Sequence, residues 1–174
     1  MVKKDSFKHS NSELILKYVL GNIVFKKHDL VINGVSSYDS LVDYDQFNKL
    51  FTPYADKFCS MAGEGFNIID FWINIVEPGG YTKTHNHISL IKELKNVPQK
   101  TGVFYLQKPR QSGNLHIEDN LIKVKKNDIL VFDPWLNHGT EKNKSKKQRI
   151  IFSVNMAKGI NKIYENGKFS FIKT

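Results

Sequence analysis

Two histidines, His85 and His87, are separated by a single residue, and a third, His138, follows much later in the chain. On a β-strand, residues i and i+2 point to the same face, so the first two imidazoles can hold one metal ion between them. His138 comes shortly after the apolar run 129–132, which has the composition of a buried strand. We therefore predict that the three histidines meet at one metal site. Imidazole suits zinc, copper, nickel and iron, so the ligands alone do not name the metal.

The other histidines, His9, His28 and His116, lack this spacing, and we interpret them as ordinary surface or half-buried residues. A purely structural role is the alternative interpretation for the first set as well. The turn-forming Pro78-Gly79-Gly80 just before His85 favours the metal site.

The length and composition predict one compact domain. A chain of 174 residues is long enough for a single core and too short for two, and its 40% hydrophobic content argues against disorder. The single cysteine, Cys59, cannot form an internal disulfide, and no apolar stretch reaches the length of a signal peptide or a membrane span. We expect a reducing, cytoplasmic setting, the host cytoplasm if the protein is phage-encoded, and no membrane association.

The formal net charge is +9, and the densest group of basic residues lies between two apolar segments: Lys142, Lys144, Lys146, Lys147 and Arg149. Such a group could contact nucleic acid or an acidic partner. We favour a solvated loop, because no recognised nucleic-acid motif accompanies these residues.

The first third of the chain predicts a few strands and one helix. Residues 13–35 alternate between apolar and polar side chains with turn signals between them, which predicts two or three short strands. Aromatic residues then recur at intervals of three and four, the apolar stripe of a helix that packs on a sheet: Tyr44, Phe47, Phe51, Tyr54 and Phe58. Asp39 or Ser40 would cap this helix, and Pro53 would kink or divide it.

From residue 67 onward, short strands separated by turns predict a sandwich or jelly roll. We expect strands at 67–77, 81–89, 101–108, 114–118, 121–124, 128–132 and 148–155. In the first and last of these, one face is apolar and the other mixed. In a closed sandwich the mixed faces would line a cavity. The expected single domain then consists of N-terminal strands with a supporting helix (1–66), a β core (67–157) and a C-terminal extension (158–174).

Taken in order, the segments of this core resemble phage and bacterial 2-oxoglutarate- and iron-dependent oxygenases built on the double-stranded β-helix, a form of jelly roll. The resemblance covers about residues 67–155. It rests on Trp72-Ile73-Asn74, Gly80, His85-Asn86-His87, Gly102-Val103-Phe104-Tyr105-Leu106, Ser112-Gly113-Asn114-Leu115, Asp128-Ile129-Leu130-Val131-Phe132, Trp135-Leu136-Asn137-His138, and Arg149 with Ser153 and Asn155.

The resemblance implies a ferrous iron site. In this superfamily the iron usually sits on a His-x-Asp or His-x-Glu pair plus a distal histidine, which leaves three positions for 2-oxoglutarate and dioxygen. Here His87 stands where the carboxylate would be. We expect His85, His87 and His138 as ligands, and Asp70 or Asp133 is the alternative oxygen ligand.

The resemblance also implies a site for 2-oxoglutarate. Arg149 occupies the usual place of the arginine that holds the distal carboxylate, for which a guanidinium fork is well matched. Ser153, Tyr105 and Asn74 are expected to contact the same co-substrate. The implied reaction is the oxidative decarboxylation of 2-oxoglutarate to succinate and carbon dioxide, most commonly coupled to hydroxylation of a small-molecule or peptidyl substrate.

Further expectations concern the surroundings of the site. Trp72 and Trp135 would supply apolar walls, although core packing explains both equally well. Residues 88–98, partly helical in pattern and next to the first two histidines, would form either a lid or a packed connection.

Two other functions stay open from the sequence. The first is a cupin-type metalloenzyme that does not use 2-oxoglutarate, because Gly79 and Glu93 lie near the positions of a first cupin motif. Under that interpretation Arg149 has no purpose. The second is a non-catalytic jelly-roll binding module whose histidines are structural.

Overall fold

A computed structural model of the chain describes residues 1–37, 44–87, 94, 96–165 and 168–173. Two antiparallel sheets face each other, and a C-terminal hairpin follows them. In spatial order the large sheet contains β1 (Val2–Ser6), β7 (Asp128–Phe132), β4 (Gln99–Gln107), β9 (Arg149–Lys158), β3 (Phe66–Thr82) and β2 (Val31–Ser36). The small sheet contains β6 (Asn120–Ile122), β5 (Leu115–Ile117) and β8 (His138–Thr140), and the hairpin contains β10 (Ile160–Glu165) and β11 (Lys168–Lys173). This is the predicted jelly roll, a double-stranded β-helix.

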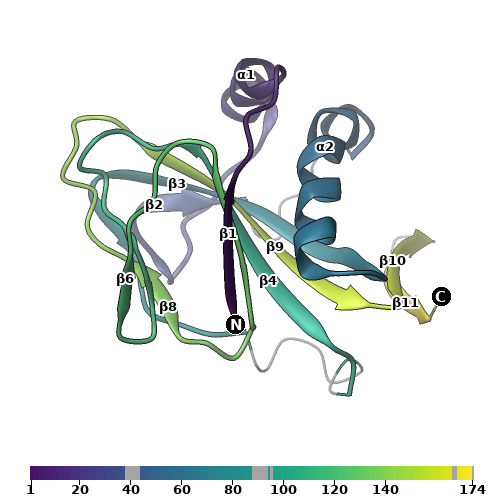
Figure 1. Cartoon of the computed structure of the whole chain (residues 1–174). Helices are drawn as coiled ribbons and strands as arrows, with labels where there is room; N and C mark the ends of the chain where they lie inside the picture. Colours follow the sequence, from purple (N-terminus) through teal and green to yellow (C-terminus); the bar gives the residue numbers. More distant parts are fainter. Residues whose placement is uncertain (38–43, 88–93, 95, 166–167, 174) are drawn as a thin grey trace.

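Figure 1 shows the small sheet on one side of the large sheet and the two helices on the other. These helices are α1 (Ser12–Asn22) and α2 (Tyr44–Ala62). Phe51, Tyr54 and Phe58 of α2 are buried against the large sheet, where the Tyr54 ring lies 4.8 Å from that of Phe104. The prediction that the aromatic stripe belongs to the core is therefore confirmed for these three residues, whereas the side chains of Tyr44 and Phe47 lie outside the described part of the chain.

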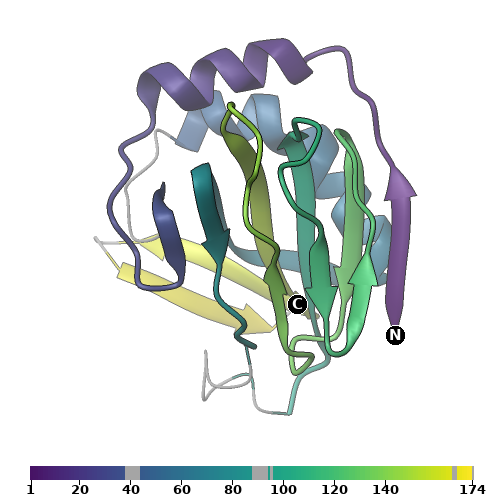
Figure 2. The same ribbon diagram turned by 90° about the vertical axis from the view of Figure 1, so that its left-hand side faces the viewer.

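The other face of the large sheet is covered by the small one, as Figure 2 shows from that side. Between the sheets lies a second apolar cluster, which includes Val103, Tyr105 and Ile151 from the large sheet and Leu115 and Ile117 from the small sheet. The mixed faces of β3 and β9 point into this space. They do line a cavity, as the sequence predicted.

The prediction of strands across residues 13–35 is wrong for its first half, because residues 12–22 form α1. Ile15 and Val19, four residues apart, are fully buried in the cluster that also contains α2. This i, i+4 spacing is the period of a helix. Ile15 and Val19 also fit an alternating pattern of apolar and polar residues, so the sequence alone did not identify the helix. Only β2 and the bridge between Lys26 and Ser36 are extended in the second half.

Of the two predicted effects of Pro53, a kink or a division of the aromatic helix, the division is wrong, since α2 continues through Pro53. Proline removes one backbone hydrogen bond from a helix interior. Phe51 and Tyr54 flank it and pack into the same core, which keeps the helix in one piece. The predicted caps, Asp39 and Ser40, lie outside the described residues.

The two strands predicted at 67–77 and 81–89 are one strand, because β3 continues through Pro78-Gly79-Gly80 and ends at Thr82. The pairing with β2 shifts its register between Ile32 and Gly34 at this point. A Cβ at Gly80 would lie 2.3 Å from the Asn33 carbonyl oxygen, so only glycine fits there. The chain then leaves the sheet, and His85 and His87 lie beyond its last residue.

Candidate metal and co-substrate site

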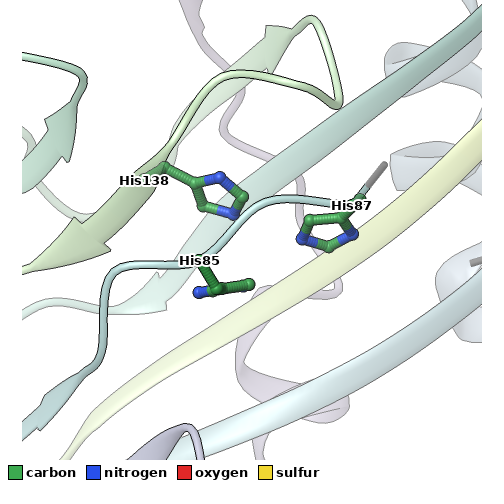
Figure 3. A group of neighbouring side chains, drawn as sticks. All are labelled: His85, His87 and His138. Carbon is green, nitrogen blue, oxygen red and sulfur yellow. The ribbon is translucent and has the colours of Figure 1, made fainter. Parts of the chain in front are cut away.

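Backbone pairing brings His85 and His138 together. The His85 N–H donates to the His138 carbonyl at 3.0 Å, and the His138 N–H donates back at 2.8 Å. This isolated bridge places the segment around His85 beside β8 at the edge of the small sheet. The His87 N–H is held by the Pro134 carbonyl at 2.8 Å. Figure 3 shows the three rings gathered, with centroids 4.3 to 5.2 Å apart and potential ligand nitrogens within 4.8 Å of one another.

The hydrogen bonds of two of these rings fix which nitrogen is free. His85 Nδ1 lies 2.8 Å from the Lys83 carbonyl oxygen, and His138 Nδ1 lies 3.0 Å from that of Leu136. A carbonyl can only accept, so each Nδ1 must carry the proton. The lone pair of each neutral ring is then on Nε2. This is the arrangement by which proteins orient imidazoles that bind metals.

His87 is oriented in a similar way by side chains of the large sheet. Its Nδ1 lies 2.9 Å from Oδ1 of Asn155, which also accepts from the Thr101 hydroxyl at 3.1 Å. The imidazole stacks on the Trp72 ring, with centroids 5.6 Å apart and planes 24° apart. His87 Nε2 is buried and has no partner. A buried lone pair without a partner is what a metal ligand requires before the ion binds.

Burial keeps these imidazoles neutral. It lowers the pKa of His87 to about 4 and that of His138 to about 3, and it lowers the pKa of His85 as well. The neighbouring rings add to the effect for His87 and His138, since protonating one ring disfavours a second positive charge nearby. All three rings therefore present lone pairs at neutral pH.

Among the described residues, the cluster contains three histidines and no carboxylate. Neither Asp70 nor Asp133, the alternative oxygen ligands, belongs to it. Asp133 instead forms ion pairs with the Lys100 ammonium and with the amino group of Met1. The donor set is thus three neutral nitrogens, which fits iron, zinc, nickel or copper.

A cavity, here called the inner cavity, extends from the histidines between the two sheets. Apart from the histidines, its polar lining consists of Asn74, Thr82, Thr101, Tyr105, Thr140 and Ser153. Several of these side chains keep polar atoms buried without a partner: the Tyr105 hydroxyl, the Thr82 hydroxyl and Oδ1 of Asn74. Such atoms are costly unless a ligand satisfies them.

Arg149 is fully buried beside this cavity. Its Nη1 donates to the carbonyls of Ser112 and Glu141, and its Nη2 donates to the Thr140 hydroxyl oxygen at 2.6 Å. These bonds account for three of the roughly five N–H groups of a guanidinium. Its Nε is buried and has no partner. Within the described part of the chain, no carboxylate forms a salt bridge with this cation.

Burial lowers the pKa of the Arg149 guanidinium, while Tyr105 and Glu141 act in the opposite direction. Arginine nevertheless keeps its charge in proteins. Burial also raises the pKa of the Tyr105 hydroxyl, which therefore stays protonated and can donate. A buried cation without a counter-ion, next to an unused hydroxyl donor, is a site for an anion.

From the sequence, Thr140 and Thr82 were missed as parts of the site, and Asn155 was named in the resemblance without a role. Thr140 accepts hydrogen bonds from the Thr82 N–H at 2.9 Å and from Arg149, so its own proton remains free to donate. Asn155 orients His87, and Thr82 lines the inner cavity. Thr140 follows His138 by two residues on one strand, a spacing that could have identified it. The role of Asn155 depends on packing between distant segments and has no local signal.

A second cavity, here called the outer cavity, adjoins the inner one. It has an empty volume of about 620 Å³, and its walls include His28, Leu30, Val31 and Ser36 from the segment that contains β2. Trp72, Asn74, Thr82, His85 and His87 line both cavities. The outer cavity therefore reaches the histidines from the side opposite β4 and β9.

The two predicted tryptophan walls have different outcomes. Trp72 is buried against His87 and lines both cavities. Trp135 is 55% exposed and lines neither cavity, so its assignment as a wall is wrong. Most of the predicted lid, at 88–93 and 95, lies outside the described residues, as does Glu93 of the cupin alternative.

The basic loop keeps its lysines away from the site. Lys142, Lys144, Lys146 and Lys147 are exposed, whereas Asn143 is buried and donates to the Val76 and Lys147 carbonyls. The four lysines agree with the interpretation as a solvated loop, whereas Arg149, the last member of the basic group, is fully buried. Neither α1 nor α2 has the length and apolar character needed to span a membrane.

Comparison with known proteins yields similarity in structure but none in sequence. No family model matches the chain, and no curated protein matches it. A viral collagen prolyl hydroxylase from Paramecium bursaria Chlorella virus-1, in complex with 2-oxoglutarate, has a TM-score of 0.63 at 13% identity, covering 90% of this chain and 96% of its own.

Two further solved structures are also similar to this chain in fold. HygX from Streptomyces hygroscopicus, with nickel, 2-oxoglutarate and hygromycin B bound, has a TM-score of 0.66 at 10% identity, covering 91% of this chain and 82% of its own. The non-haem α-ketoglutarate-dependent epimerase SnoN from nogalamycin biosynthesis has a TM-score of 0.67 at 9% identity, covering 96% and 82%. The chain therefore has the fold of 2-oxoglutarate- and iron-dependent oxygenases, which confirms the predicted double-stranded β-helix.

Proposed function

We propose that the protein is a non-haem iron oxygenase that couples the oxidative decarboxylation of 2-oxoglutarate to hydroxylation of a small-molecule or peptidyl substrate. One observation supports this most strongly. Three imidazoles, two of them buried, line one cavity, and a buried guanidinium without a salt-bridge partner in the described residues donates to Thr140 of the same cavity. The likeness in fold to structures that contain 2-oxoglutarate agrees with the proposal.

His85, His87 and His138 would hold the iron through Nε2. Bound iron(II) would supply the redox chemistry with dioxygen and would take two oxygens of 2-oxoglutarate. The chain contributes the orientation of the ligands, because each Nδ1 is already held by an acceptor. Preorganised ligands lose little freedom when the ion binds, which favours affinity.

Arg149 would bind the distal carboxylate of 2-oxoglutarate, and the Tyr105 hydroxyl would donate a second hydrogen bond. Both have unused buried donors in the described structure. Thr140 would donate its free proton to the same end of the co-substrate. Ser153 and Asn74 line the same cavity and would contact the rest of the molecule.

The charges of the site favour a dianionic co-substrate. Three neutral imidazoles leave the double positive charge of a ferrous ion unbalanced, and the acceptors behind them are backbone carbonyls and an amide. Arg149 adds another positive charge nearby. A dicarboxylate with one end on the metal and the other on Arg149 would offset both. A cupin-type enzyme without 2-oxoglutarate would leave the buried guanidinium unpaired.

The expected setting is cytoplasmic. Cys59 is a half-buried free thiol, and burial raises its pKa, which keeps it in the unreactive thiol form. Ferrous iron and a free thiol are both stable in a reducing compartment.

Anaerobic titration of the iron(II)-loaded protein with 2-oxoglutarate tests the proposed function. We expect a visible metal-to-ligand charge-transfer band that saturates at one equivalent of 2-oxoglutarate, and succinate release after air is admitted. In Arg149→Ala the same band should require a much higher concentration. Iron binding without a band at any concentration would favour the cupin-type alternative, and a failure to bind iron would favour a non-catalytic module.

A further inference from the structure

We infer that the outer cavity binds an uncharged, hydrogen-bonding group of the primary substrate, such as a carboxamide or a hydroxyl. This inference rests on the proposed function, because it takes the histidine cluster as the reacting centre. His85 and His87 form part of the cavity wall, so a group bound there lies next to that centre.

Among the residues that the structure describes, the walls of the outer cavity contain no lysine, arginine, aspartate or glutamate. In the proposed holoenzyme, the dianionic 2-oxoglutarate would offset the charge of the metal ion on His85 and His87. A charged group would lose its hydration in this cavity without gaining a counter-ion, which is costly. An uncharged group meets no such penalty.

The same walls carry buried polar atoms that lack partners. Asn74 and Thr82 are 6% and 8% exposed, and Oδ1 of Asn74 and the Thr82 hydroxyl make no hydrogen bond. An amide oxygen accepts, and a hydroxyl donates and accepts. The 2-oxoglutarate dianion has no donor for Oδ1 of Asn74 and can contact only the amide NH₂ of this side chain, so Oδ1 still needs a donor. A group that can both donate and accept, as a carboxamide or hydroxyl does, would satisfy them. A purely apolar group would leave them unsatisfied at a cost.

His28 is a further polar residue of the outer cavity, and its Nδ1 accepts from the Leu30 N–H at 3.3 Å. From the sequence, this histidine was expected to be an ordinary surface or half-buried residue. Trp72, Leu30 and Val31 supply the apolar walls, which suit the hydrocarbon part of the bound group.

The outer cavity also adjoins an open groove, because His28 and Val31 line both. Charged side chains border this groove: Lys27, Asp29, Glu77 and Lys83. The uncharged group can therefore be one end of a larger polar molecule whose remainder lies at the surface.

Three isosteric probes test the inference: benzamide, benzoate and benzamidine, which carry no charge, a negative charge and a positive charge. Trp72 and Trp135 are the two tryptophans of the chain, so Trp135→Phe leaves Trp72 as the sole fluorescent reporter at the cavity wall. The titrations use this variant loaded with zinc and 2-oxoglutarate, and they are repeated on the metal-free protein.

We expect benzamide to change the Trp72 emission saturably, with an affinity at least tenfold higher than that of either charged probe. Thr82→Val, which removes only the hydroxyl, should weaken benzamide binding severalfold. Leu30→Phe should narrow the cavity and weaken benzamide binding at least tenfold without adding a tryptophan. Leu20→Phe, at a 52% exposed position on α1, is the matched control and should change nothing.

Equal or tighter binding of benzoate or benzamidine would overturn the inference, as would no response to benzamide or full benzamide affinity in Leu30→Phe. The proposed function fails separately. If the proposed function is wrong, zinc or 2-oxoglutarate will not bind. The probe titrations of the metal-free protein will still show whether the outer cavity prefers benzamide to the charged probes.

Discussion

Replacing Tyr105 with phenylalanine should affect stability and co-substrate binding in opposite directions. The side chain is 1% exposed, and its hydroxyl makes no hydrogen bond within the protein. An unsatisfied buried hydroxyl costs about 1 to 3 kcal/mol, so removing it should leave the free energy of unfolding unchanged or raise it by up to about 1 kcal/mol. With 2-oxoglutarate bound, the same hydroxyl would donate to a carboxylate. Losing a hydrogen bond to a charged group costs about 1.5 to 3 kcal/mol, or roughly ten- to a hundredfold in the dissociation constant.

Tyr54→Phe is the matched control. Tyr54 is fully buried as well, but its hydroxyl donates to Oδ1 of Asn11 at 3.1 Å in the core beneath the helices. This variant should lose about 1 kcal/mol of stability and bind 2-oxoglutarate normally. Urea denaturation of the metal-free proteins and anaerobic titration of the iron-loaded proteins measure the two quantities. The reasoning is refuted if Tyr105→Phe binds 2-oxoglutarate as the wild type does, or if it loses as much stability as Tyr54→Phe.

Three more predictions concern the metal and its surroundings. Arg149→Ala should raise the 2-oxoglutarate concentration needed for turnover at least tenfold, while metal analysis finds iron largely retained. His138→Ala should instead empty the metal site. An unchanged 2-oxoglutarate requirement in Arg149→Ala would contradict the role of the guanidinium. Asn155→Ala should raise the zinc dissociation constant roughly tenfold in calorimetry, since His87 loses the acceptor that fixes its ring, and an unchanged constant would argue against that role. Burial holds the pKa of His87 near 4 and that of His138 near 3, below about 6.5 in the unfolded chain, so unfolding takes up protons as the pH falls below about 6.5. The metal-free protein should therefore lose roughly 1.4 kcal/mol of stability per pH unit for each of these histidines between about pH 6.5 and 4, and urea denaturation that gives a flat profile would contradict this.

The sequence predicted the histidine cluster because its signals are local. His85 and His87 lie two residues apart, and His138 follows a strongly apolar strand, so their convergence needed only a closed sandwich. The structure brings the three together by a different route, since His85 and His87 lie beyond the end of β3. A single backbone bridge between His85 and His138 aligns them instead.

Other features depend on contacts that no local pattern records. The helix α1 was missed because its stripe of Ile15 and Val19 also fits an alternating pattern, and only packing against α2 decides between the two. The five residues of β1 are all exposed, so no burial pattern marks them as a strand. Asn155 and His87 are far apart in the sequence, and their hydrogen bond joins β9 to the segment beyond the end of β3, where the Pro134 carbonyl holds the His87 backbone.

A crystal structure of the protein grown anaerobically with iron(II) and 2-oxoglutarate tests the central claim most directly. We predict one iron on the Nε2 atoms of His85, His87 and His138, with 2-oxoglutarate bound to it through two oxygens and its distal carboxylate on Arg149 and Tyr105. An iron held by a carboxylate in place of His87, or 2-oxoglutarate bound away from Arg149, would contradict the account.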